Sequence, residues 1–235
     1  FDADDASTFV LDGDDIVSWT DKSTNALVAT QSTAGDRPQR VVKTQHSGGT
    51  ATGNVYSSIV QGDMLDLPSP FVEVTDSDGQ FTHFVVMSLF SYGHYRHWYR
   101  FGAGFTPAWQ HSGMGSGYGA PLMHKTNVGA STGGTRTAIG SANYLGNEAA
   151  HLITYIGDST DGYSCRLNGT EVQAPDGDTP LQDVNPAALH HPHAFPAFIG
   201  DRCYIAEMIQ VPRRCTSSEI SEVESYLNTK WGVYS

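Results

Sequence analysis

Short runs of β-branched and aromatic residues, each followed by a turn rich in Gly, Asp or Pro, recur along almost the whole chain. Such runs favour strands, and the turn residues between them favour sharp chain reversals. Many short strands at this spacing are typical of an all-β sandwich. The segments predicted to be strands are 7–11, 16–20, 40–44, 57–61, 81–90, 151–157, 163–172 and 203–211.

The segment SSEISEVESYLNT, residues 217–229, has a different periodicity. Thr216 and Glu219 fit a capping box at its start, and Gly232 can provide a left-handed end. The apolar residues of this segment recur at helical intervals, at Ile220, Val223 and Leu227. We therefore predict one short C-terminal helix, anchored on the sandwich by Trp231.

The size and charge of the chain limit its domain organisation and its partners. At 235 residues it is long enough for one large sandwich, so we expect residues 1–235 to form a single domain. The formal net charge of -12 argues against nucleic acid as a partner, because nucleic-acid binding needs clustered Lys and Arg. No apolar run approaches the roughly 20 residues that cross a bilayer, so we expect no membrane insertion. Because the chain begins at Phe1, we expect it to be part of a longer protein.

The two ends of the chain carry a family pattern. Residues 1–38 contain Leu-Asp-Gly-Asp-Asp and then Trp-Thr-Asp-Lys-Ser, and residues 205–232 contain Ala-Glu followed by Tyr-Leu-Asn-Thr-Lys-Trp-Gly. With FVVMSLF and the Asn-Gly turn in RLNGTEV, these motifs resemble concanavalin A-like, laminin-G-like jelly-roll domains. The resemblance implies a jelly-roll sandwich of two antiparallel sheets with one short C-terminal helix. It brackets nearly the whole chain, but residues 91–147 match it poorly.

The same resemblance suggests where such a chain works. Domains of this kind are common in bacterial surface proteins and in phage tail fibres or virion appendages, so we expect a virion-surface or extracellular location. The scaffold hosts lectins, glycan hydrolases, lyases and purely adhesive modules, so the fold does not by itself assign an activity.

Residues 88–119 combine many aromatic side chains with histidines, arginines and glycines. If 94–101 is a strand, alternation places its basic residues and one Trp on one face, and the glycine-rich stretch after it places further aromatics on loops. Sugar rings stack on such aromatic side chains while polar groups bind their hydroxyls. A single aromatic here more often fills the core, and self-association would use the same residues. The predicted ligand-binding residues are His94, Arg96, Trp98, Arg100, Phe105, Trp109 and Tyr118.

Catalytic motifs are weak, and no catalytic residue is predicted. The Glu-x-Asp-x-Glu strand of β-glucanases is missing, and we expect Glu219, Glu222 and Glu224 to form a solvated helix face. GASTG at 129–133 lies in a Gly- and Thr-rich context rather than between a strand and a helix. The Arg, His and Tyr residues of HYRHWYR are the types that a polysaccharide lyase needs.

Several acidic turns could donate oxygens to calcium. Asp and Gly in turns more often only form the turn, so calcium is a weaker alternative, and no other cofactor is expected. HHPHAF at 190–195 is better interpreted as a solvated loop than as a metal site. The calcium candidates are Asp2, Asp4, Asp5, Asp76 and Asp78.

Three cysteines, Cys165, Cys203 and Cys215, match no metal-binding spacing. Their number leaves at least one thiol free, and buried small hydrophobic residues are the better interpretation of all three. A Cys203–Cys215 bridge stays open.

The sequence therefore predicts a non-catalytic recognition module that binds a cell-surface glycan or host-surface receptor. The first alternative is a structural decoration or assembly domain that contacts neighbouring virion protein chains. A polysaccharide lyase or hydrolase comes third.

Overall fold

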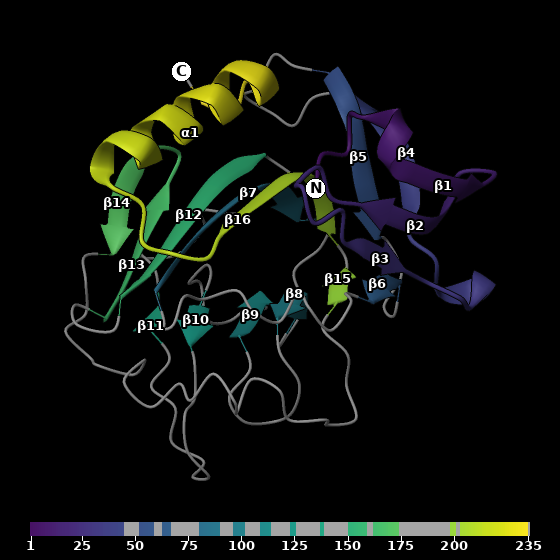
Figure 1. The fold of residues 1–235 in the computed structure, drawn as a ribbon, viewed down its shortest axis with the longest axis horizontal. Helices are drawn as coiled ribbons and strands as arrows, with labels where there is room; N and C mark the ends of the chain where they lie inside the picture. The colour runs from purple at the N-terminus through teal and green to yellow at the C-terminus, as the bar shows by residue number, and fades with distance from the viewer. Residues whose placement is uncertain are drawn as a thin grey trace, which may run out of the picture.

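A computed structural model describes most of the β-framework and the C-terminal helix of this chain. The described part contains sixteen strands, two short 3-10 helices and one α-helix. The strands form two antiparallel sheets packed as a sandwich, with the α-helix on the outside (Figure 1), which confirms the predicted jelly-roll architecture. The described residues are 1–44, 52–58, 63–66, 80–89, 96–101, 109–113, 123–125, 137–138, 150–158, 162–173, 198–200 and 203–234.

The first sheet lies under the helix, and its neighbouring strands are all antiparallel. Strand β7 (Phe81–Leu89) is central, paired with β12 (His151–Asp158) on one side and β16 (Cys203–Val211) on the other. Beyond these come β13 (Gly162–Leu167) and β14 (Thr170–Gln173) at one end, and β5 (Thr52–Ser58) and β4 (Gln39–Thr44) at the other.

The second sheet lies on the side of the sandwich away from the helix (Figure 1). The two sheets are joined by a single pair, Asp15↔Gln39 of β2 and β4. Within the second sheet, β3 and β6 also meet at a single pair, Thr30↔Asp66. In order, the strands of the second sheet are β11 (Thr137–Ala138), β10 (Met123–Lys125), β9 (Trp109–Gly113), β8 (Arg96–Phe101), β15 (Phe198–Gly200), β6 (Met64–Asp66), β3 (Val28–Thr30) and β2 (Asp15–Thr20), with β1 (Phe9–Asp12) beside β2.

The strand predictions hold best where apolar runs are long. The predicted strand 203–211 coincides with β16, and residues 81–89 of the predicted strand 81–90 form β7, with residue 90 outside the described residues. The predicted strand 163–172 is a hairpin, because Asn168 and Gly169 turn the chain with φ of 50° and 75°. Such positive φ values are those of a two-residue hairpin turn, which explains the Asn-Gly pair.

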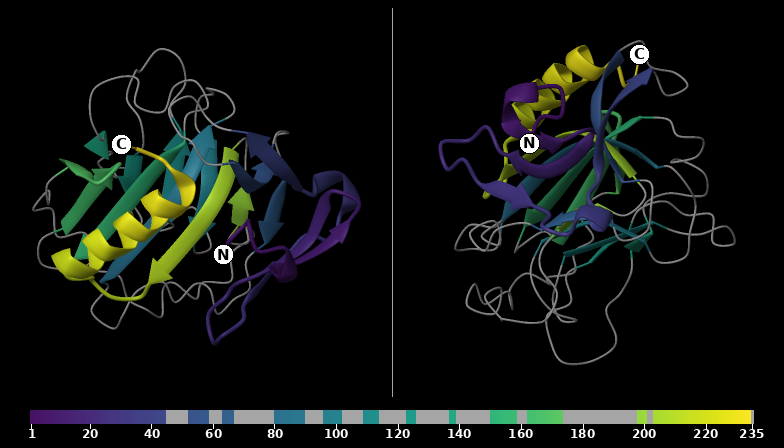
Figure 2. Two further views of the ribbon diagram at one scale, coloured as in Figure 1. Left: turned by 90° about the horizontal axis from the view of Figure 1, so that it is seen from above. Right: turned by 90° about the vertical axis from the view of Figure 1, so that its right-hand side faces the viewer.

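The α-helix α1 spans Ser217–Trp231 and begins as predicted. The Glu219 amide donates to Thr216 Oγ1 at 3.3 Å, and the Thr216 amide donates to Glu219 Oε2 at 2.8 Å, which completes the capping box. Gly232 follows the helix in the left-handed conformation, with φ 58°. Figure 2 shows α1 running diagonally across the outer face of the first sheet.

Two groups of apolar residues hold these layers together. Under α1, Leu227 and Trp231 pack with Phe84, Val86 and Leu152 of the first sheet, as predicted for the anchoring Trp. At the other end, Trp19 of β2 is fully buried, with its ring centroid 5.1 Å from Phe1 and 5.0 Å from Phe9.

Cys165 and Cys215 are buried free thiols, so the Cys203–Cys215 bridge is not formed. Both agree with the predicted role of small hydrophobic residues. In the part of the chain that the structure describes, no helix is long and apolar enough to cross a membrane.

Candidate functional site

The predicted ligand-binding residues fall on two neighbouring strands of the second sheet. Arg96, Trp98 and Arg100 belong to β8, and Trp109 is the first residue of β9. The two strands pair antiparallel, with Phe101 opposite Trp109. Residues that are eight positions apart in sequence are therefore direct cross-strand neighbours, which brings Trp109 beside the end of β8.

Two details of the sequence prediction need correction. Trp109 was expected on a loop, but its pairing with Phe101 places it in a strand. The register of β8 against β9 also shifts between His97 and Arg100, so strict alternation does not run through the predicted strand 94–101.

The remaining predicted binding residues, His94, Phe105 and Tyr118, lie outside the described residues.

Strands β8 and β9 are not at the edge of their sheet. β8 pairs with β15 on its other side, where Arg100 is opposite Phe198, and β9 pairs with β10. In the pairing of β9 with β10, His111 of β9 lies directly opposite His124 of β10. Sequence reasoning missed this pair, because β10 is only three residues long and its pairing joins segments without a shared motif.

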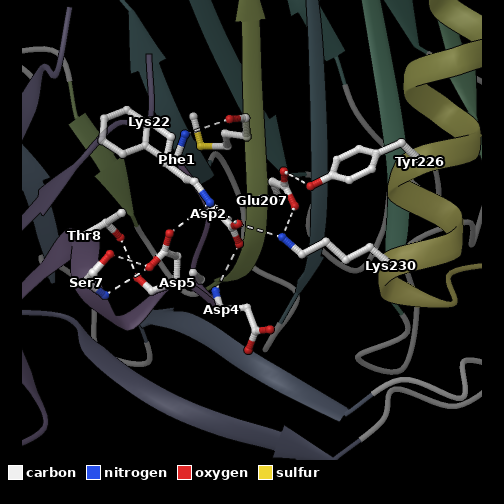
Figure 3. Close-up of polar contacts among 12 residues, drawn as sticks. Phe1, Asp2, Asp4, Asp5, Ser7, Thr8, Lys22, Glu207, Tyr226 and Lys230 are labelled. Atoms are coloured by element: carbon white, nitrogen blue, oxygen red, sulfur yellow. Dashed lines mark hydrogen bonds and ion pairs between the residues drawn. The ribbon is translucent and has the colours of Figure 1, made fainter. Parts of the chain in front are cut away.

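A second set of polar residues gathers where the N-terminal segment meets β16 and α1 (Figure 3). The Lys230 Nζ atom lies 2.7 Å from Asp2 Oδ2 and 2.8 Å from Glu207 Oε2. Lys22 Nζ lies 3.3 Å from the same Asp2 oxygen and 2.9 Å from Asp5 Oδ2. We call Asp2, Asp5, Lys22, Glu207 and Lys230 the N-terminal charge cluster.

Pairing keeps Asp2 and Asp5 of this cluster ionised. Burial opposes ionisation of Asp2, but hydrogen bonds and attraction from Lys230 and Lys22 outweigh it and lower the pKa of Asp2. Hydrogen bonds from Ser7 and Lys22 lower the pKa of Asp5 to about 2.

These contacts bear on the calcium candidates. Asp2 and Asp5 already bind lysine ammonium groups, and Asp4 is exposed. Among the residues that the structure describes, no three His, Cys, Asp or Glu side chains are grouped so that they could hold a metal ion. Asp76 and Asp78 lie outside the described residues.

The buried titratable groups of the first sheet and of α1 bear on catalysis. His83 of β7 is 2% exposed, and its Nδ1 lies 2.5 Å from Gln210 Oε1. Burial lowers the pKa of His83 to about 3, against the weaker opposing effect of the Gln210 hydrogen bond. The buried Glu207 and Glu224 are paired with Lys230 and Arg166. His83 is therefore neutral and inaccessible near neutral pH, and the two carboxylates are buried in ion pairs.

The lowered pKa of His83 predicts acid sensitivity. The unfolded chain binds a proton at this side chain below about pH 6.5, whereas the folded chain resists protonation until about pH 3, so stability falls as the pH drops through this window. At pH 5 the loss from this group should be about 2 kcal/mol relative to pH 7. Urea unfolding of the native chain and of His83→Gln at both pH values measures it. An equal loss in both proteins would contradict the prediction.

Comparison with known proteins finds similarity at the level of structure. No protein-family model matches the chain, and no curated protein matches it in sequence. Among solved structures, the binding domain of Paraclostridial Mosquitocidal Protein 1 is similar with a TM-score of 0.58 and 13% identity, over 94% of this chain and 52% of that one. The binding domain of Botulinum neurotoxin DC in complex with rat synaptotagmin II has a TM-score of 0.54 and 9% identity, over 92% and 52%.

An enzyme appears among the similar structures too. Trypanosoma rangeli sialidase in complex with sialic acid has a TM-score of 0.51 and 14% identity, over 92% of this chain and 32% of the sialidase. This chain thus spans about half the length of the binding domains and a third of the sialidase. At these identities the comparisons establish a shared β-sandwich fold.

Proposed function

We propose that this chain is a non-catalytic recognition module that binds a cell-surface glycan or host-surface receptor through strands β8 and β9. The observation that carries the proposal is the pairing of these strands, which brings Trp98 and Arg100 of β8 close along the sheet to Trp109 of β9. Aromatic residues beside arginines provide stacking platforms and charged donors, the combination that sugar recognition uses.

The structural comparisons support a binding role. The mosquitocidal protein and neurotoxin structures are binding domains, and the Botulinum neurotoxin DC domain is also solved in complex with SialylT, with a TM-score of 0.54 and 8% identity. The sialidase shows that the same architecture also occurs in an enzyme. The neutral, inaccessible His83 and the paired buried carboxylates favour the non-catalytic role for the part described here.

The arginines suggest which glycans to test. The chain carries a net charge of -12, yet Arg96 and Arg100 lie within five residues of each other on β8. Arginine forms strong paired hydrogen bonds with carboxylates, so we infer a preference for glycans that carry an acidic sugar. A module of this kind acts on a virion surface or outside the cell, as in a phage fibre or a bacterial surface protein.

Truncating Trp109 tests the proposal. We expect Trp109→Ala to weaken binding to acidic glycans by about 1–3 kcal/mol, or roughly 5- to 150-fold, because an anchoring aromatic loses its stacking contact. Trp98→Ala should behave similarly. Binding is measured on an array of acidic glycans and their neutral counterparts, beside a thermal melt of each variant.

Tyr226→Ala is the matched control, because this aromatic is 48% exposed but lies on α1, away from β8 and β9. It should leave glycan binding unchanged. Full binding by both Trp variants would place the recognition surface elsewhere. If the Trp variants instead lost contacts with neighbouring protein chains, the result would favour the assembly domain. Release of unsaturated uronates, abolished by His97→Ala or Arg100→Ala, would favour a lyase.

A further inference from the structure

One row of paired residues crosses six neighbouring strands of the second sheet, from β3 to β10. Each member lies directly opposite the next one, and directly paired residues lie on the same face of a sheet. The register shift between β8 and β9 lies outside the pair that Arg100 forms with Gln110, so it does not interrupt the row. We call this set the Arg100 row, and its members in order are Thr30, Asp66, Phe198, Arg100, Gln110 and Lys125.

The Arg100 row lies on the face of the sheet that is turned away from the core. In β3, Ala29 is completely buried, whereas the next residue, Thr30, is exposed. In β6, Leu65 is completely buried, whereas the next residue, Asp66, is partly exposed. Successive residues of a strand belong to opposite faces, so Thr30 and Asp66 assign the whole row to the outer face.

The charge changes sign along this row. Asp66 is at the β6 end, Arg100 is two strands farther along, and Lys125 is another two strands beyond Arg100. Neighbouring strands are about 4.8 Å apart, so the positions of Arg100 and Lys125 are separated by about 10 Å across the sheet. The chain as a whole has a net charge of -12, yet this end of the row has two cations and no acidic member. Two negative groups at the same separation complement it.

The other two members at this end are residue types that bind neutral sugars. Phe198 is on β15, the strand next to Arg100, and an aromatic ring stacks on the apolar face of a sugar. Gln110 is on the strand between the two cations, and its amide is both a donor and an acceptor for hydroxyl groups. From β10 to β15 the row therefore reads cation, amide, cation, aromatic.

We propose that the Arg100 row binds a linear glycan that runs across the strands and carries a carboxylate on every second sugar. One sugar of an extended chain is about as long as the spacing between neighbouring strands, so carboxylates on alternate sugars match Arg100 and Lys125. The neutral sugars match Gln110 and Phe198. Asp66 repels a carboxylate beyond Phe198 and so confines the acidic sugars to the other end of the row. This ligand class rests on the proposed function, and it adds residues of β10 and β15 to the site.

Hyaluronan oligosaccharides, in which glucuronate alternates with a neutral sugar, test this with the whole 235-residue chain. In calorimetric titrations, Arg100→Gln and Lys125→Gln should each weaken binding of the tetrasaccharide by about tenfold, because each loses one charge-assisted hydrogen bond. Neither should weaken binding of the carboxyl-reduced tetrasaccharide, which is neutral. Phe198→Ala should weaken binding of both tetrasaccharides alike, by about fivefold or more, because stacking does not depend on the carboxylate.

Arg214→Gln is the matched control. Arg214 is exposed between β16 and α1, and its replacement removes the same charge from the other side of the sandwich. It should leave binding unchanged, and a thermal melt checks the folding of every variant. A comparison that needs no variant uses the native chain, which should bind the tetrasaccharide about tenfold more tightly than the disaccharide with its single carboxylate.

The outcomes separate this proposal from the proposed function. Equal affinity for the acidic and the carboxyl-reduced tetrasaccharide would overturn the row as the site of an acidic glycan. An effect of Arg100→Gln without one of Lys125→Gln would show that the glycan does not cross from β8 to β10, which also overturns it. Trp109 is not a member of the row, so weaker binding by Trp109→Ala alone would overturn the row and leave the proposed function standing. A native chain that binds no glycan would overturn both.

Discussion

Replacing Trp19 with alanine should lower the free energy of unfolding by about 3–5 kcal/mol, the range for a large aromatic removed from a core. Trp19 has no exposed surface, and its ring contacts both Phe1 and Phe9. Its loss would open a cavity between the N-terminal segment and β1 that these rings cannot fill. Urea unfolding followed by circular dichroism measures the change.

Val10→Ala is the control for this experiment. Val10 lies on β1 next to Phe9 but is 58% exposed, so its truncation should change stability by no more than about 0.5 kcal/mol. If both variants lost the same free energy, Trp19 would not be the centre of this part of the core.

Replacing Glu224 with alanine should cost about 3 kcal/mol. Glu224 is 3% exposed, and its Oε1 accepts hydrogen bonds from Thr154 Oγ1 at 2.8 Å and Arg166 Nε at 2.9 Å. Removing the carboxylate leaves the Arg166 cation without its ion-pair partner. Because the Arg166 side chain is 25% exposed, water offsets part of this penalty. The expected loss of stability therefore lies at the low end of the range for broken buried ion pairs.

Two further variants make this test specific. Glu222→Ala removes an exposed carboxylate from the same helix and should change stability by no more than about 0.5 kcal/mol. Glu224→Leu/Arg166→Met replaces the pair with apolar residues and should recover much of the loss. If Glu224→Ala were as stable as Glu222→Ala, the ion pair would contribute nothing to the attachment of α1.

The prediction that Glu224 belongs to a solvated face was wrong. Glu219 and Glu222 agree better with a solvated helix face. Glu219 caps the helix and contacts Arg213, and Glu222 is exposed. The available signal was helical spacing, because Glu224 is four residues after Ile220 and three before Leu227, on the apolar stripe. The position of Glu224 on this stripe, rather than its charge, determines its burial, because a buried carboxylate is stable when it is paired.

Sequence patterns predicted an element well where the element is determined by its own residues rather than by the strands that pair with it. The capping box and Gly232 define α1 from within a few residues, and β7 and β16 are apolar runs long enough to be recognised alone. Strands of two or three residues, such as β3, β6 and β15, carry no periodicity of their own. They are strands because other segments pair with them.

The candidate binding surface was predictable only in outline. The sequence indicated β8 and its arginines, but the pairing of Phe101 with Trp109 and the register shift in β8 depend on how two strands meet. The N-terminal charge cluster was missed for the same reason, since Lys230 and Glu207 are more than 200 residues from Asp2. From its local sequence alone, Asp2 is a calcium candidate, whereas in the fold it binds Lys22 and Lys230.

The placement of β16 has a consequence for the order of folding. Thr82, on the central strand, donates from Oγ1 to the Arg213 carbonyl 131 residues later, and Phe1 meets Met208 across 207 residues. Contacts of such long sequence separation close slowly, because the entropy of loop closure is lost before they form. While the chain is being synthesised, β7 therefore exposes an unpaired apolar edge until β16 has left the ribosome. We expect this interval to be when the nascent chain is most prone to aggregate and to depend on chaperones.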